Sequence, residues 1–261
     1  VMCYTMQMET KVMDECELQR LISKGLVHQR LLRGMKPAHA AELAGVPTKV
    51  YCAAERGEAP LAKEALATLC RQWGVSLFSL CEPRHIPRAA FLTCKPKNKT
   101  ESARRDEDVW EVYKWARDYA FIERELERTV EPPAKLFQQR DPVEAARFVR
   151  GTFWEKGGFT PESMPSVLAR HGIKVCVKPF LAAKQKGFSF HDPDCGWVIA
   201  VNANPSLSAE EQARAAAHEL GHIVLGTHDH YCTHGTPEEK DADAFASELL
   251  LPELSFRAFW E

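Results

Sequence analysis

The motif His218-Glu219-Leu220-Gly221-His222 holds the residue types that most directly suggest chemistry in this chain. In a helix of 3.6 residues per turn, positions i and i+4 share one face, so both imidazoles can reach one cation. Glu219 lies about 100° around such a helix from His218, close enough to contact a water molecule without binding the cation. The spacing therefore predicts a zinc site of the kind used for hydrolysis.

A third protein ligand is expected, because catalytic zinc sites usually combine three protein side chains with one water. Downstream of the motif, Glu239 and Asp243 again stand at positions i and i+4. We expect Glu239 to bind the metal, and Asp243 to accept a hydrogen bond from the far nitrogen of a ligating histidine. The residues from Thr236 to Glu239 also form a capping-box pattern, which gives Glu239 an alternative role as a helix cap. In that case Glu238 and Asp241 are the alternative ligands.

The segment between the two motifs is rich in polar rings that can stabilise an oxyanion in a transition state. These residues are His228, His230, Tyr231 and His234. A solvated loop side chain is the simpler interpretation for each of them, and the same holds for His191.

Two capped helices are predicted to carry the motifs. Ser208 and Glu211 form a capping box that opens a helix through about Leu225. A second helix is expected from Pro237 to about Leu250, with proline at its first position. The first helix would present both histidines, and the second would bring Glu239.

Three strand-like runs come before these helices, at residues 173–180, 186–192 and 196–202. The turn sequence between the last two runs predicts a hairpin. Because the run 196–202 lies just before the metal helix, we expect its edge to pair with an extended substrate.

Three regions follow from the patterns along the chain. Residues 14–82 consist of short apolar-periodic segments broken by glycines, which predicts an all-helical bundle. Residues 83–140 are expected to be a linker with a long charged helix at about 102–128, a solvated spacer that packs lightly on a neighbour. Residues 141–261 alternate helical and strand patterns, so the predicted fold class is α+β.

Composition excludes several classes of protein. Apolar residues make up 45% and charged residues 27% of the 261 positions, as in an ordinary globular protein. No run of about 18 apolar residues predicts a membrane span. The first residues lack the pattern of a secretory signal, and the nine cysteines include no Cys-x-x-Cys pair. We therefore expect a cytoplasmic protein without a disulfide framework or association with a membrane.

The region 141–261 carries two family-like segments, GFSFHDPDCGWVIAVNANPSLSAEEQARAAAHELGHIVLG and EEKDADAFASELLLPE. The positions of the second segment that match the signature are Glu239, Ala242, Asp243, Phe245, Ala246, Leu249, Leu250, Leu251 and Pro252. On these residues the region resembles the ImmA/IrrE family of metallo-endopeptidases. One departure is Gly226, where many members carry another histidine.

This resemblance implies a zincin-like domain of the gluzincin type, with a small sheet and the HExxH helix. It also implies that Glu219 is the catalytic acid/base and that three side chains bind Zn²⁺, namely His218, His222 and Glu239. The implied substrate is a repressor or another regulatory protein.

The stretch 30–80 resembles an XRE-type helix-turn-helix domain. The residues that carry the resemblance are Ala41, Gly45, Val46, Glu55, Arg56, Gly57, Leu66, Leu69, Gly74, Val75 and Ser76. It implies a recognition helix at about 48–56 that presents its first residues to DNA, namely Thr48, Lys49 and Cys52. Pro37, Pro47 and Ala53 stand where the family commonly has polar residues, so weak DNA binding is expected, with dimerisation or an adaptor role as the alternative.

Together these patterns predict a zinc-dependent endopeptidase that acts on a regulatory partner protein and is coupled to a helix-turn-helix module. The main alternative is a DNA-binding transcription regulator or toxin–antitoxin component whose metal site is sensory or structural. A structural site has no use for Glu219, which favours the enzyme.

Overall fold

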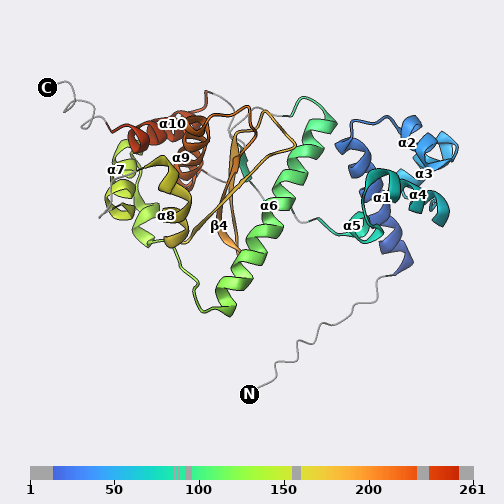
Figure 1. The fold of residues 1–261 in the computed structure, drawn as a ribbon, viewed down its shortest axis with the longest axis horizontal. Helices are drawn as coiled ribbons and strands as arrows, with labels where there is room; N and C mark the ends of the chain where they lie inside the picture. Colours follow the sequence, from blue (N-terminus) through green and yellow to red (C-terminus); the bar gives the residue numbers. More distant parts are fainter. Residues whose placement is uncertain are drawn as a thin grey trace, which may run out of the picture. The chain divides into compact units, whose positions relative to one another are not determined.

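The computed structural model of the chain divides into two compact units, Val1–Arg84 and His85–Glu261 (Figure 1). The structure describes residues 14–84, 86–87, 89–91, 96–154, 160–227 and 235–252. Within these ranges every helix is too short or too polar to cross a lipid bilayer.

All the regular elements among the described residues of the first unit are helices. Its elements are α1 (Glu15–Leu32), α2 (Pro37–Ala44), α3 (Thr48–Glu55), α4 (Lys63–Trp73) and α5 (Leu77–Cys81). Their apolar faces meet in one cluster around Leu26, Tyr51 and Leu69, each 0% exposed. Gly45 ends α2 with a φ of 67°, a left-handed conformation that suits glycine and lets α3 begin three residues later.

A single mixed sheet forms the centre of the second unit. Its strands are β1 (Ala89–Phe91), β2 (Ile173–Lys178), β3 (Gly187–Asp192) and β4 (Gly196–Asn202). They lie in the order β1-β3-β4-β2, and β3 and β4 form the antiparallel hairpin that the turn sequence predicted. β2 pairs with β4 in parallel, and β1 pairs with β3 in antiparallel orientation.

The strand β4 therefore lies in the interior of the sheet. Its backbone is bonded to β3 on one side and to β2 on the other. The expectation that its edge receives an extended substrate is wrong, because a strand bonded on both sides has no free backbone groups to offer.

Helices cover both faces of this sheet, so that the unit has three layers (Figure 1). The long helix α6 (Lys99–Glu125) covers one face. The other face carries α7 (Pro142–Phe153), α8 (Met164–Arg170), α9 (Ala209–Leu225) and α10 (Pro237–Leu250), with the short 3-10 turns η1 (Ala134–Gln138) and η2 (Pro161–Ser163). Alternate strand residues serve the two layers: Phe188 and Phe190 face α6, whereas Ile199 and Val201 face α9.

The helix α6 was expected to be a solvated spacer packed lightly on a neighbour, and this interpretation is wrong because one face of the helix is buried against the sheet. Val109 and Tyr113 on its apolar stripe are buried against the sheet. Asp108, 1% exposed, accepts hydrogen bonds of 2.9 Å from the backbone N–H groups of Leu181 and Ala182. Burial raises the pKa of Asp108 to about 6, although the two N–H groups favour its charged form. A charged helix with a narrow apolar stripe thus forms a structural layer of the unit.

The strand β1 was missed in the sequence, where the proline and lysine clusters of residues 83–100 favour an exposed linker. It has three residues in a segment rich in proline and lysine, too short for an alternating pattern.

Candidate metal centre

The helix α9 begins where its capping box predicted. The Ser208 hydroxyl accepts a hydrogen bond from the Glu211 backbone N–H, and the Glu211 carboxylate accepts one from the Ser208 N–H. The helix packs on β3 and β4 and carries the three motif side chains into the interior. His218, Glu219 and His222 are at most 1% exposed.

The helix α10 approaches α9 closely because Gly221 lies at their contact. A Cβ atom at this position would lie 3.2 Å from the Cα of Ala242 and 3.1 Å from the Cδ1 of Phe245. The glycine inside the motif therefore provides the room that brings Glu239 of α10 to the two histidines.

The three predicted ligands meet in space. The Nε2 atoms of His218 and His222 lie 3.1 Å apart. Glu239 places Oε2 3.6 Å from the Nε2 of His218 and Oε1 3.4 Å from the Nε2 of His222. One ligand atom from each residue lies within 4.8 Å of the others, an arrangement able to hold a metal ion.

Glu239 is not used as a helix cap. The Thr236 hydroxyl accepts a hydrogen bond of 3.4 Å from the Glu239 backbone N–H, while the Glu239 carboxylate turns toward the imidazoles. The alternative ligands lie outside this group, since Asp241 is exposed and Glu238 half-buried.

The outer nitrogens of both imidazoles are held by side chains. The Nδ1 of His218 lies 3.1 Å from the Oδ1 of Asp243, the contact expected from the sequence. The Nδ1 of His222 lies 2.7 Å from the Thr227 hydroxyl, which sequence reasoning missed. Thr227 follows the residue that ends α9, Gly226, and its backbone N–H donates to the His222 carbonyl at 2.9 Å. This helix-ending turn places the hydroxyl against the ring, so a threonine just after the capping glycine was the available signal.

These contacts leave unshared electron pairs of the histidine and glutamate side chains directed into the cluster. An ionised Asp243 only accepts hydrogen bonds, so the Nδ1 of His218 carries the ring proton and its Nε2 lone pair faces the cluster. The Oε1 atom of Glu239 is buried without a hydrogen-bond partner among the described residues. Two nitrogen donors and one carboxylate fit a divalent cation such as zinc.

Glu219 lies beside this cluster and contacts the sheet. Its Oε2 accepts a hydrogen bond of 2.7 Å from the Ser189 hydroxyl, a residue that the sequence did not single out. Its Oε1 is buried and has no hydrogen-bond partner in the described part of the chain. Burial raises the pKa of Glu219 to about 7, against the opposing effects of His222 and Ser189.

Four of the five candidates for oxyanion stabilisation are not tested by the structure. His228, His230, Tyr231 and His234 lie outside the described residues. His191 is exposed, and its ring packs 4.5 Å from the ring of Trp197.

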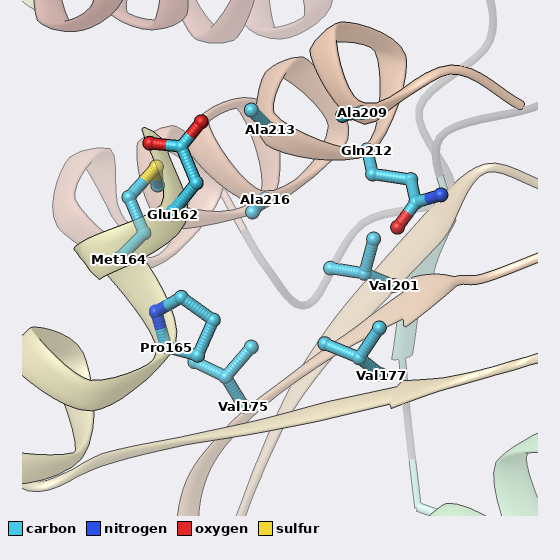
Figure 2. Close-up of a pocket in the computed structure, with 10 residues that line it drawn as sticks. All are labelled: Glu162, Met164, Pro165, Val175, Val177, Val201, Ala209, Gln212, Ala213 and Ala216. Atoms are coloured by element: carbon cyan, nitrogen blue, oxygen red, sulfur yellow. The ribbon is translucent and has the colours of Figure 1, made fainter. Parts of the chain in front are cut away.

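A separate, mostly apolar pocket of about 220 Å³ lies between α8, the strands β2 and β4, and the first half of α9 (Figure 2). Its lining residues are Glu162, Met164, Pro165, Val175, Val177, Val201, Ala209, Gln212, Ala213 and Ala216. Ala209 and His218 are nine residues apart on α9 and therefore point to opposite sides of the helix. The pocket is thus not part of the metal centre.

The residues expected to meet DNA lie on α3 of the first unit. Thr48 and Lys49 are exposed in its first turn, and Cys52 is half-buried one turn later. Pro47 precedes the helix and provides no side-chain hydrogen bond to cap it.

Comparison with known proteins places the metal centre in a family. Residues 168–261 match the family model Peptidase_M78, described as the IrrE N-terminal-like domain. No curated protein and no solved structure gives a significant match to the chain. The matched range contains the sheet strands β2–β4, the HExxH helix α9 and Glu239 of α10. Residues 168–261 of this chain, which carry the whole candidate metal centre, are therefore an IrrE N-terminal-like domain of the Peptidase_M78 family.

Proposed function

We propose that this protein is a zinc-dependent endopeptidase that cleaves a regulatory, repressor-type partner protein. One observation carries the proposal. A buried group of two histidines and one glutamate, able to hold a cation, lies beside a fourth buried side chain, Glu219. A site that only stores or senses a metal has no need of this extra carboxylate.

The donor set favours zinc over the harder cations. Imidazole nitrogens suit zinc, whereas calcium and magnesium prefer sites made entirely of oxygen ligands. His218, His222 and Glu239 would hold the ion, and Asp243 and Thr227 would keep the two rings in place. When bound, zinc supplies the Lewis acidity that polarises a peptide carbonyl and acidifies water.

Glu219 is the residue to which we assign proton transfer. Its Oε2 is engaged by Ser189, and its Oε1 is free of hydrogen bonds within the described residues. We assign Oε1 as the atom that takes a proton from the attacking water and later delivers it to the leaving amine.

The choice of a regulatory protein as substrate rests on the resemblance to the ImmA/IrrE family and on the first unit. In that unit, α2 and α3 are joined by a tight turn at Gly45, the arrangement of a helix-turn-helix. We propose that this XRE-like module binds a partner protein, and DNA only weakly, because α3 exposes few polar side chains beyond Thr48 and Lys49.

Labelling of new protein N-termini in a lysate of the source cells tests the proposal and identifies the substrate at the same time. The zinc-loaded chain and Glu219→Gln are added in parallel to lysate from cells that lack the protein. We expect a small set of new N-termini, in regulatory proteins, made by the natural chain and absent with Glu219→Gln. Identical sets from both chains, or no new N-termini at all, would overturn the peptidase assignment.

A further inference from the structure

The strand β3 provides the wall against which Glu219 rests. Ser189, at the middle of this strand, is 0% exposed, and its hydroxyl donates a 2.7 Å hydrogen bond to the Oε2 of Glu219. A hydroxyl buried between a sheet and a helix is costly unless it has a partner. The partner of this hydroxyl is the side chain to which proton transfer is assigned.

A second feature of β3 shapes the same wall. Gly187 lies two residues before Ser189 and so faces the same side of the sheet. A Cβ atom at this position would lie 3.2 Å from the Cγ of Glu219 and 3.0 Å from the carbonyl oxygen of Ala200. Both distances are tight, and the second is to backbone that cannot move away easily. Because residue 187 is a glycine, the Glu219 side chain has room to pack against β3.

The contact with Ser189 makes the two oxygens of Glu219 unequal. Oε2 accepts the serine hydrogen bond, whereas Oε1 is buried with no hydrogen-bond partner in the described residues. Since Glu219 is 0% exposed, bulk water does not compete for Oε2. The Ser189 hydroxyl thus holds Oε2 of Glu219 and leaves Oε1 available.

The position of the hydroxyl is itself fixed by the sheet. Ser189 is paired with Ile199 of β4 on one side and with Ala90 of β1 on the other. A residue bonded into a ladder on both sides has little freedom to follow a moving carboxylate.

We propose that Ser189 is a positioning residue that fixes the Glu219 carboxylate for proton transfer. This inference rests on the peptidase function proposed above and adds to it a residue outside the motif. It predicts that Ser189→Ala lowers kcat about 10- to 100-fold with little change in KM, because a small misplacement of a reacting group has an effect of this size. Ser189→Thr, which keeps the hydroxyl, should restore most of the rate.

The contact can be measured without metal or substrate. In the zinc-free full chain, labelled with ¹³C at glutamate side-chain carboxyls, the Glu219 signal is the one missing from Glu219→Gln. We expect Ser189→Ala to shift this signal and Ser189→Thr to leave it near its natural position. Ser166→Ala is the control, because it removes one hydroxyl hydrogen bond, to the Ser163 carbonyl, at an exposed position of α8. An unshifted Glu219 signal in Ser189→Ala would overturn the inference.

Kinetics on a peptide that spans a cleavage site found by the N-terminal labelling complete the test. Ser189→Ala should keep about one zinc per chain, because Ser189 is outside the ligand group. In a Glu219→Gln background it should cause no further loss, since a residue that acts through Glu219 has nothing left to position. If Ser189→Ala folds poorly, Ser189→Cys keeps the volume with only a weak S–H donor and should lose the same rate.

The two proposals fail in different ways. If Glu219→Gln and the natural chain behave alike, the peptidase function fails, whatever the carboxyl signal shows. If Glu219→Gln is inactive while Ser189→Ala retains the full kcat, only the role of Ser189 is overturned.

Discussion

The metal centre and the first turn of α3 differ in how the fold treats the residues that the sequence singled out. His218, Glu219 and His222 are buried, and each contacts a polar side chain of another segment. Thr48 and Lys49 are exposed to solvent. A buried polar group must find its partner within the protein, so its surroundings restrict what it can do. An exposed polar group forms hydrogen bonds with water, so its surroundings in the protein do not indicate its role.

This difference predicts a gradient of effects. Changes in the buried cluster should alter metal content and stability together, because the cluster joins α9 and α10. Changes on α3 should alter only the binding of a partner.

The largest effect is expected for Glu239→Ala. It removes one of three protein ligands, so the chain should lose its zinc and melt at a lower temperature than the zinc-loaded natural chain. Elemental analysis and thermal unfolding measure both. The control is Glu238→Ala, which should keep its zinc.

The opposite outcome has a clear meaning. If Glu239 mattered only to the start of α10, its loss would cost about 1 kcal/mol of helix stability and leave the zinc in place. Zinc at one per chain in Glu239→Ala would move the third ligand to Glu238 or Asp241.

A smaller effect is expected for Thr227→Val, which removes the hydroxyl from the Nδ1 of His222 and keeps the shape. Partners that orient a ligating histidine typically contribute 10- to 100-fold to metal affinity. Competition with a chromogenic chelator should therefore show zinc binding weakened by about that factor. Thr68→Val, at a half-buried site of α4, is the matched control, because it also removes one hydroxyl hydrogen bond. An affinity within twofold of the natural chain would show that Thr227 does not orient the ring.

Asp108 tests whether α6 is part of the second unit's structure. Its pKa in the folded chain, about 6, lies above its usual value of 3.8. The folded chain therefore binds this proton more tightly than the unfolded chain does. The free energy of unfolding should fall as the pH rises from about 4 to about 6, by an amount on the order of 2–3 kcal/mol.

Urea unfolding of the zinc-free protein across this range measures the effect. Asp108→Asn should remove this part of the pH dependence. Asp118→Asn, at an exposed position of the same helix, should not. Equal slopes for the natural chain and Asp108→Asn would contradict the role of α6 in the unit.

The smallest effect is expected on α3. DNA binding should be weak and should show a shallow dependence on salt, because few phosphate contacts are available. Lys49→Ala should abolish what binding remains, while Lys24→Ala, on the exposed side of α1, should not. A nanomolar, sequence-selective complex at about 150 mM salt would show that α3 reads DNA after all.

The sequence predicted the parts of the structure that depend on local signals. The capping box at Ser208 and the proline at 237 marked the starts of α9 and α10, and the i, i+4 spacing placed His218 and His222 on one face. The turn before Gly196, whose φ is 74°, marked the hairpin of β3 and β4. Each of these signals lies within a few residues of the element that it defines.

The contact of Thr227 with His222, five positions away, was missed despite a local signal, whereas the other missed contacts depend on neighbours distant in the sequence. Ser189 contacts Glu219 across 30 positions, and Asp108 contacts the chain 73 positions away. The strand β4 lies in the interior of the sheet because β2 pairs with its second edge. No pattern within residues 196–202 indicates this pairing. A single sequence shows which residues can do chemistry more readily than which residues hold them in place.

Zinc content and cleavage in Glu219→Gln, measured on the same preparation, test most directly whether this buried site is a catalyst. If Glu219 transfers protons and binds no metal, the variant should keep about one zinc per chain and an unchanged melting curve. Cleavage of the peptide that spans the natural site should fall by roughly 10³-fold, the typical contribution of a general base. Loss of zinc would instead make Glu219 a ligand, and full cleavage with zinc retained would contradict its role in catalysis.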